Sequence, residues 1–590
     1  MKHLQLFIIV FMEFLPKSNQ MALNPSAQSN SAVEVIDGTV SEFYNVVDSC
    51  IRRSEVMPGQ YKSITSPSYS NNCPIDESSF TTIDIGCPAP QIVDINNSFI
   101  TANVKVKVKF GAGIASKNDI NTFFVGWRSS LDVLQRYTIY CNHKVVHDQA
   151  YVGEESFILQ SLIPEHVRCR KPNQYTTYEN ASSFSPDVCG TYITINSSAG
   201  TEDNPTALAA TEVDVEIPIK IDINQFLLFQ NFKYLPGFCG TWSIKLHPSI
   251  QNLIVCPVDP QFTVPRAKLE LLKNLASAST NGLDDYNHHF VQIGDKVKCL
   301  KVVKFKEPTI TSSGTVYTRN SEITSGTIVV SASNCTVEIV LYHQTQFELM
   351  YDIYDGLKAR YMARPLTIPV NKLDYGRFAG IIAGSASNPK QTSSTYTAAV
   401  SNVESLFILP FHDDLHHTVC FNPNFEDLYL SISGFGNFPQ QPFNTGGNDE
   451  KHDRFVNMTL DALNINNSPI MAPNKDLLNS LEYKKTKYWT NSDTIIHDKN
   501  NQELFDKSNF LIGIPFSNDI DFQGGLTSNG NINIKLSAGK SIINDIGQAL
   551  NTSDCSIGAT VLFCTDCALM IKVIPYADQP EVRLVCERIV

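Results

Sequence analysis

The sequence predicts a mainly β protein built from two consecutive β-sandwiches. Each half of the chain carries the same pattern: an apolar strand with a proline, a glycine-containing turn, and a strand ending in Ile-Lys-Leu. The first copy runs from Ile217 to Leu246 and the second from Phe510 to Leu536. The chain also has 33 Phe and 22 Tyr against 3 Trp and 9 Met, and Phe and Tyr favour pleated, half-buried strands.

Length and charge restrict the classes of function. The 590 residues suffice for about three or four domains of ordinary size. Charged residues make up only 18% of the chain, below the usual share of about a quarter, which suggests a large core or much surface buried against partners. The net charge of -13 excludes a chain that is basic throughout and binds nucleic acid, although one local basic face is still allowed.

The N-terminus begins with an apolar run. Leu4–Leu15 resembles the start of a signal peptide, but it is too short to span a bilayer, Glu13 interrupts it, and no small-residue cleavage site follows. We expect residues 1–20 to be untranslated, removed or disordered, with Met21 as the functional start. No later segment is long and apolar enough to cross a membrane.

Residues 21–90 are polar and rich in turn-forming residues, which predicts an N-terminal arm that packs on neighbours. A short helix is expected at Glu42–Arg53.

Residues 91–260 are expected to form the first unit. Leu131–Tyr140 should open as a short helix and continue as a strand, and Asn142 and His143 stand where a hairpin would turn. Residues 165–205 are dense in Ser, Thr, Asn, Pro and Tyr, which indicates a long surface loop.

A linker and a second unit follow. Residues 261–300 form the linker, with a helix beginning near Pro265. Residues 301–590 form the second unit, with a Gly/Asn/Pro-rich insertion at 434–453 and a flanking helix at 474–487. Both units have short strands broken by turn signals and long loops between particular strands, which is typical of a jelly roll.

A basic stretch lies within the first unit. Val104–Phe110 alternates valine and lysine, and alternate residues of a strand point to opposite faces. The lysines are therefore expected on a solvated strand face and the valines in the core, which is more common than a nucleic-acid contact.

The 15 cysteines are odd in number and scattered, and a chain with a sufficient core needs no disulfide framework. Reduced thiols that serve as small hydrophobic residues are expected. Cys564 and Cys567 form the one C-x-x-C, but a zinc ribbon needs a second pair or nearby histidines. Their setting in an apolar strand favours core or turn cysteines over a metal or redox site.

Two histidine clusters allow metal binding on composition alone. His412–His417 places three His and two Asp in six residues, yet it lies in a loop, and sequence spacing does not show converging ligands. A hydrated polar turn is the simpler interpretation. His288 and His289, which follow Asp284 and Asp285, are a weaker candidate.

Gly153–Ser156 contains two adjacent glutamates, Glu154 and Glu155. Adjacent strand residues point to opposite faces, so the two carboxyl groups could not act together on a strand. The chain has no G-x-S-x-G, P-loop, G-x-G-x-x-G or H-E-x-x-H motif. The sequence therefore predicts no catalytic, cofactor-binding or metal-binding residue, and a non-enzymatic protein.

Three segments resemble one protein family. Phe124–Tyr140, Val152–Phe157 and Phe226–Gly240 look like parts of the major capsid protein of the Polinton (Maverick) and virophage group, in the double jelly-roll capsid lineage. In architecture the resemblance extends over residues 85–590, while the local motifs are confined to these segments.

The resemblance implies two eight-stranded jelly rolls side by side in one chain, with few short helices and long loop insertions. Three subunits would form a pseudo-hexagonal capsomer, and capsomers would tile an icosahedral shell around double-stranded DNA. Loops 165–205 and 434–453 would form outer towers or trimer contacts. Further partners would be penton and minor capsid proteins. Sequence-specific nucleic-acid binding is not expected. The protein would be made in the host cytoplasm and reside in the virion.

The main alternative is a secreted or cell-surface β-sandwich adhesin or lectin. The apolar N-terminal run and seven N-x-Ser/Thr sequons support it: Asn96, Asn180, Asn196, Asn334, Asn457, Asn466 and Asn551. Such sequons also arise by chance in an asparagine-rich chain. A β-rich hydrolase with a dispersed active site is a further alternative that no motif supports. If residues 436–450 form an external loop, their deletion should leave the sandwich folded and disturb assembly.

Overall fold

The structure is a computed structural model. It describes these residues: 32–53, 62–67, 72–75, 79–110, 119–127, 129–153, 155, 189–196, 211–249, 253–258, 291–292, 297–298, 305–306, 309–311, 314–316, 327–330, 335–383, 390–399, 402–411, 425–445, 450–463, 510–516, 531–541, 555–574 and 580–585.

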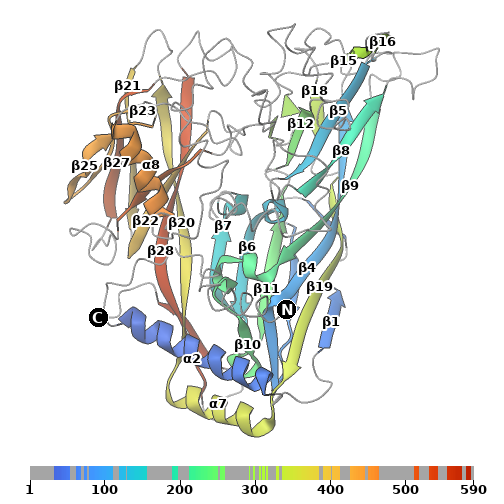
Figure 1. The fold of residues 1–590 in the computed structure, drawn as a ribbon, viewed down its shortest axis with the longest axis vertical. Helices are drawn as coiled ribbons and strands as arrows, with labels where there is room; N and C mark the ends of the chain where they lie inside the picture. The colour runs from blue at the N-terminus through green and yellow to red at the C-terminus, as the bar shows by residue number, and fades with distance from the viewer. Residues whose placement is uncertain are drawn as a thin grey trace, which may run out of the picture.

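The protein is mainly β, as the sequence predicts. Two groups of antiparallel sheets stand side by side, and two helices lie across their lower end (Figure 1). These helices are α2 (Ala32–Arg52) and α7 (Tyr351–Ala363). A third helix, α8 (Glu450–Ala462), packs on the group of sheets described below as the second sandwich.

One group of sheets, called here the first sandwich, has a large sheet opposed by smaller ones. In the large sheet, β1 (Lys62–Pro67), β19 (Thr336–Glu348), β4 (Gln91–Phe110), β18 (Thr327–Val330) and β14 (Val297–Lys298) lie in that order, with β2 (Asn72–Pro74) on β19 and with β9 (Thr211–Asp222) and β10 (Tyr234–Pro236) on β4. The sheet that opposes it has the order β3 (Thr81–Ile85), β11 (Trp242–Pro248), β6 (Leu134–Cys141), β7 (Lys144–Ala150). Farther up are β13 (Val291–Gln292), β12 (Ile254–Val258), β5 (Asp119–Trp127) and β15 (Phe305–Lys306), with β8 (Cys189–Asn196) on β5, and the hairpin of β16 (Thr309–Thr311) and β17 (Gly314–Val316).

The second group, called here the second sandwich, has two sheets. One has the order β20 (Leu366–Ala383), β28 (Cys555–Lys572), β22 (Val403–Phe411), β26 (Ile512–Pro515), with β29 (Glu581–Val585) on β28. The other has the order β21 (Lys390–Ala399), β27 (Asn531–Ser541), β24 (Leu428–Ile432), β25 (Gly436–Phe443), with β23 (Phe425–Glu426) on β27. Residues of both sheets and of α8 share one buried cluster, so the two sheets and the helix enclose a common core.

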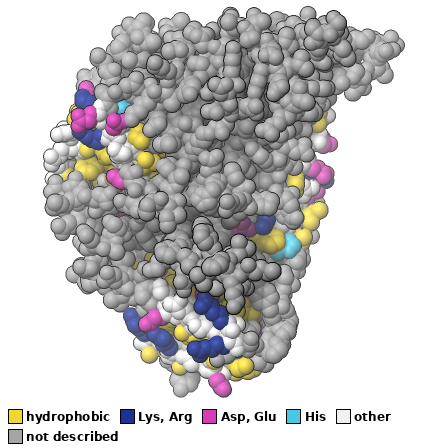
Figure 2. Space-filling model, in the orientation of Figure 1, with side chains coloured by type: hydrophobic (Ala, Val, Ile, Leu, Met, Phe, Trp, Pro, Cys, Tyr) yellow, Lys and Arg dark blue, Asp and Glu magenta, His cyan; other side chains and the backbone are white. Residues whose placement is uncertain are grey.

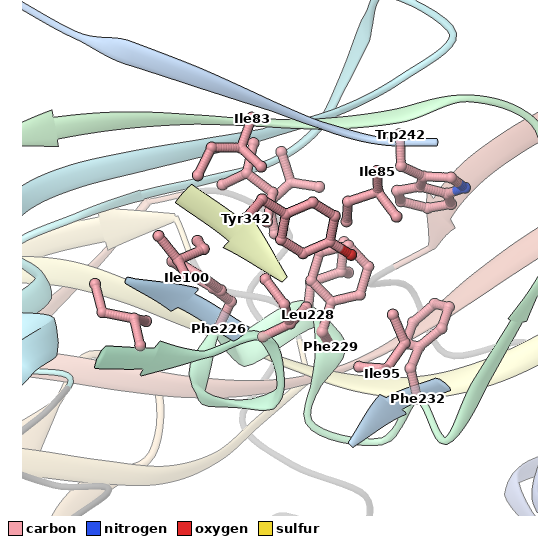
Figure 3. Packing of buried hydrophobic residues seen from close by; sticks show 14 of the residues in the cluster. Ile83, Ile85, Ile95, Ile100, Phe226, Leu228, Phe229, Phe232, Trp242 and Tyr342 are labelled. Atoms are coloured by element: carbon pink, nitrogen blue, oxygen red, sulfur yellow. The ribbon is translucent and has the colours of Figure 1, made fainter. Parts of the chain in front are cut away.

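Aromatic side chains fill the core of the first sandwich (Figure 3). Phe226, Phe229 and Phe232 lie in and beside short 3₁₀ turns, η4 (Ile223–Gln225) and η5 (Leu227–Phe229), and all three are buried. The Phe229 and Phe232 rings pack edge-on against Trp242 of β11. Burial of each such ring contributes about 1.5–3 kcal/mol to folding, so these turns anchor the chain between its two sheets.

The repeated sequence pattern occupies corresponding places in the two sandwiches. In the first copy, β9 lies in the large sheet and β11 in the opposing one. In the second copy, β26 and β27 likewise lie in opposite sheets. Each copy therefore carries the chain from one layer of a sandwich to the other.

Several local predictions are confirmed. The helix expected at Glu42–Arg53 is the second half of α2. Leu131–Tyr140 opens as the 3₁₀ turn η1 (Ser130–Val133) and continues as β6. Asn142 and His143 form the two-residue turn between β6 and β7, with φ of 49° and 64°; two positive φ angles are what the right-handed twist of a tight hairpin requires.

Two loop predictions are wrong in part. The segment 165–205 contains strand β8, which pairs with β5, because Tyr192, Ile193 and Ile195 give it the β-forming content that the surrounding polar residues obscured. The segment 434–453 contains strand β25 and the start of α8. Phe443 at the end of β25 is fully buried, so the described residues 434–445 belong to the second sandwich and do not form an external tower.

The expected division at residue 300 does not match the sheets. Strands β18 and β19 come after residue 300 in the chain, yet both pair with β4 of the first sandwich. The sheets change at α7, which connects β19 to β20. Part of the expected arm also packs on the chain's own body, since β1 forms the edge of the large sheet beside β19. The expected leader 1–20 and the helices near Pro265 and at 474–487 lie outside the described residues.

Candidate functional site: the seam between the two sandwiches

The two sandwiches share one hydrophobic core at their lower ends. Leu366, Ile368 and Val370 of β20 are buried in the same cluster as the core of the first sandwich, together with Leu569 and Ile571 of β28. We call this shared region and the contacts above it the seam. Separating the two sandwiches here would expose buried apolar side chains to water, which is unfavourable. The two sandwiches therefore form one block at this end.

Helix α2 closes the seam from below. Val40, Phe43, Val47 and Cys50 repeat at helical spacing, and all four are buried. The Phe43 ring packs edge-on against Tyr361 of α7, with ring centroids 5.8 Å apart, and also against Phe238. The helix therefore contacts both the first sandwich and the connection into the second.

Polar contacts fix the position of α2. Lys233 Nζ lies 2.6 Å from Asp48 Oδ2, and the Tyr234 hydroxyl donates to Asp48 Oδ1 at 2.8 Å. At the other end, Arg360 of α7 pairs with Glu42. Figure 2 shows Lys and Arg side chains gathered at this lower end, where α2 and α7 lie. Exposed ion pairs contribute at most about 1 kcal/mol. These pairs therefore orient α2 on the seam and add little to the free energy of unfolding.

Higher in the seam lies a buried polar cluster. Glu155 has no exposed surface, and its Oε1 accepts a hydrogen bond from the Tyr137 hydroxyl at 2.9 Å. The same hydroxyl accepts one from Leu227 N–H at 3.1 Å. Burial raises the pKa of Glu155 to about 8, while the hydrogen bonds from Tyr137 and Leu227 act in the opposite direction. Burial likewise raises the pKa of Tyr137.

Strand β7 adds two polar side chains to this cluster. His147 and Gln149 point inward with Tyr137, and each is about 2% exposed. Burial lowers the pKa of His147 to about 4, and Lys372 of β20 acts in the same direction. The imidazole is therefore neutral near pH 7. His147 Nε2 and Gln149 Oε1 make no hydrogen bond among the described residues.

Direct contacts join the sandwiches around this cluster. The rings of Tyr151, which follows β7, and Tyr375 of β20 are stacked. Asn231 Nδ2 donates to the Pro369 carbonyl at 2.8 Å. The turn residue Asn142 reaches the Pro580 carbonyl at 3.5 Å.

The structure separates the residues that the sequence singled out. Glu155 lies in the seam, and Glu154 is outside the described residues. The described residues therefore contain only one of the two glutamates that the sequence places side by side. Both histidine clusters, at 412–417 and at 288–289, are also outside them. The lysine strand is confirmed as a solvated face: Val104 is buried, and Lys105 pairs with Glu338 at 2.9 Å.

The two cysteines of the C-x-x-C motif lie in β28, as expected, and Cys564 is a buried, reduced cysteine. The expectation of a reduced thiol is wrong for Cys567, which is disulfide-bonded. Six further cysteines with described side chains are buried and reduced: Cys50, Cys73, Cys87, Cys141, Cys239 and Cys335. Burial raises the pKa of Cys87 and Cys141 to about 12, so both thiols stay protonated and unreactive at neutral pH.

Within the described ranges, no three or more metal-ligating side chains come together. None of the helices described here is long and apolar enough to span a bilayer.

Sequence reasoning did not find the seam. Glu155 belongs to one of the segments that carry the family resemblance, but nothing in the local pattern shows that its carboxyl group is buried. The partners Tyr137 and Leu227 are distant from it in the chain, and only the folded structure brings them together.

Solved structures similar to this chain come from viruses. A chain of the Sputnik virophage is 11% identical, with 91% of this chain and 90% of that chain covered and a TM-score of 0.45. The mavirus major capsid protein is 10% identical over 87% of this chain and 88% of its own, with a TM-score of 0.44. The Faustovirus major capsid protein is 8% identical over 93% and 100%, with a TM-score of 0.36.

The mavirus and Faustovirus proteins are named as major capsid proteins, the class of protein that the sequence resembles. No protein-family model matches the sequence, and no curated protein matches it.

Proposed function

We propose that this chain is a structural capsid protein. Three copies would form a pseudo-hexagonal capsomer, and capsomers would tile an icosahedral shell around double-stranded DNA. The observation that carries the proposal is the seam: two β-sandwiches stand side by side and share one hydrophobic core. The family resemblance of the sequence supports the same conclusion.

Geometry connects the seam to a capsomer. Two similar blocks in each subunit become six blocks around a three-fold axis, which gives a nearly hexagonal outline with true three-fold symmetry. A hexagonal unit tiles a surface only if its six blocks keep their relative positions. The shared core and α2 hold the two blocks of each subunit in a fixed relation.

The remaining parts of the proposal follow from this role. The protein acts by assembly with itself and with penton and minor capsid proteins, and not as an enzyme. It needs no sequence-specific contact with nucleic acid. It is made in the host cytoplasm and resides in the virion.

Assembly can be tested on the purified protein. The chain is expressed from Met21 in the cytosol, its mass is measured by light scattering after size-exclusion chromatography, and the peak is imaged by negative stain. Particles of about three times the mass of one chain with a pseudo-hexagonal outline, or closed shells, are expected. A monomer at every concentration, also after shell-promoting salt is added, would contradict the proposal.

One observation favours the secreted alternative. Cys567 is disulfide-bonded, and disulfides persist mainly in oxidising compartments. Mass spectrometry of the protein from eukaryotic cells, alkylated without reduction, separates the two candidates. A capsid subunit from the cytoplasm should lack glycans at its sequons and should fold with Cys567 reduced. Glycans together with a complete disulfide would favour the adhesin or lectin.

A further inference from the structure

Glu155 stands where two connections between the sandwiches begin. One runs from its Oε1 through the Tyr137 hydroxyl (2.9 Å) to the N–H of Leu227 in η5 of the first sandwich (3.1 Å), and the Leu227 side chain packs in the core cluster of the second sandwich. The other runs from its backbone N–H to the Tyr151 carbonyl (3.3 Å), and the Tyr151 ring stacks on Tyr375 of β20. Both connections therefore end on the second sandwich.

The site favours a neutral carboxyl group. Glu155 is completely buried, and its Oε2 has no hydrogen-bond partner among the described residues. The other described charged or titratable groups around the cluster are contributed by β6, β7 and β20: Arg136, His147, Asp148, Lys372 and Asp374. Each of the two cations among them already pairs with an aspartate. A carboxylate formed at Glu155 would thus be a buried charge with no counter-ion among the described residues, which is strongly unfavourable.

The backbone beside Glu155 is also constrained. Tyr151 has φ of 59°, a conformation that a bulky residue rarely adopts and that persists only where the surroundings enforce it. The backbone N–H of Glu155 closes this turn, so a movement of Glu155 toward water would be transmitted to the Tyr151–Tyr375 contact.

We propose that Glu155 is a protonation switch for the seam. The neutral carboxyl group keeps β20 of the second sandwich held against η5 and Tyr151 of the first. Release of its proton to solvent leaves a charge that must reach water, and the seam loosens to admit it. This inference rests on the seam geometry and is independent of the capsid assignment.

The pH range follows from the shifted groups. The pKa of Glu155 is raised to about 8, against about 4.3 in an unfolded chain. The closed seam therefore holds one extra proton between these values, and its stability falls as pH rises through 8. His147, with its pKa lowered to about 4, has the opposite effect below about pH 6.5. Of these two groups only Glu155 contributes between pH 6.5 and 8, and seam opening should increase about tenfold per pH unit until the pH nears 8.

Hydrogen exchange of the full-length protein tests the switch. Protection of the amides of Leu227–Phe229, corrected for the intrinsic exchange rate, is measured at several pH values from 6.5 to 8. It should fall about tenfold per pH unit in the natural sequence, stay level in Glu155→Gln, and fall as usual in the control Glu216→Gln. Glu216 is a glutamate of β9 with a 60% exposed side chain. Level protection in the natural sequence, or an unchanged slope in Glu155→Gln, would overturn the proposal.

A second measurement applies if Glu155→Gln does not fold. Infrared spectra of the natural protein with isotopically labelled glutamate should show a protonated-carboxyl band at pH 6.5 that disappears by pH 9. In Tyr137→Phe, which removes a hydrogen bond that favours the charged form, the band should persist to higher pH. A missing band at pH 6.5, or no shift in the variant, would refute a neutral Glu155.

Discussion

The ring of Tyr151 in the first sandwich stacks on the ring of Tyr375 in the second, with centroids 3.6 Å apart and planes 13° apart. Both side chains are only partly buried, so this contact lies above the shared core and not within it. It joins the two sandwiches above the level that the shared apolar cluster at the base reaches. The seam is therefore held at two levels, by apolar burial below and by an aromatic and hydrogen-bonded contact above.

The Tyr151–Tyr375 contact should show as a coupling in a double-mutant cycle. Tyr151→Ala, Tyr375→Ala and the double variant are compared by the free energy of unfolding in denaturant. Stacked aromatic pairs contribute about 0.5–1.5 kcal/mol beyond their buried area, so we expect a coupling energy of about 1 kcal/mol. Additive effects of the two substitutions would show that the rings contribute nothing as a pair.

Phe43 should carry much of the attachment of α2. Phe43→Ala removes a ring that is 1% exposed and packs on Tyr361 and Phe238, and the free energy of unfolding should fall by about 3–5 kcal/mol. Asn45→Ala is the matched control, because Asn45 lies on the exposed side of the same helix and should change stability by less than about 0.5 kcal/mol. Equal effects from both variants would mean that α2 is not anchored through its apolar face.

Gly240 should tolerate no side chain. Its φ is 88°, and an added Cβ would lie 2.7 Å from both terminal atoms of the Asn142 side chain. That side chain holds Thr241 N–H at 3.0 Å and reaches the Pro580 carbonyl of the seam.

Gly240→Ala should therefore lower the melting temperature through backbone strain of about 1–3 kcal/mol. The control Gly86→Ala meets nothing within 4 Å of the added Cβ and should leave the melting temperature nearly unchanged. A harmless Gly240→Ala would contradict the close approach of Asn142.

Removal of residues 436–450 should unfold the second sandwich, contrary to the expectation from sequence. Phe438 and Phe443 of β25 are buried in its core, and loss of the strand also exposes the next strand, β24. The deletion variant should be insoluble or bind a hydrophobic dye. A control that changes the exposed Gln440 and Gln441 to Ser should stay folded and soluble. A soluble, cooperatively unfolding deletion variant would restore the external-loop interpretation.

Local sequence patterns predicted local structure well. Alternation placed Val104 inside and Lys105 outside, and Asn142-His143 marked a tight turn, since both signals act within a few residues of the chain. The patterns failed for β8 and β25, where strand residues stand within polar or proline-rich surroundings. For β8, pairing with the distant strand β5 supplied the stability that local preference lacked. For β25, pairing with the preceding strand β24 and burial of Phe438 and Phe443 did so.

By itself the sequence determined that the chain is mainly strands, because apolar residues alternate along it, and the pattern repeated in its two halves predicted two sandwiches. Only the tertiary structure decided which strands share a sheet, such as β19 with β4 across the expected boundary. It also decided that Glu155, Tyr137 and Leu227 meet in a buried seam. Periodicity fixes which face of a strand is apolar, whereas long-range pairing and the burial of a single carboxyl group depend on how the whole chain packs.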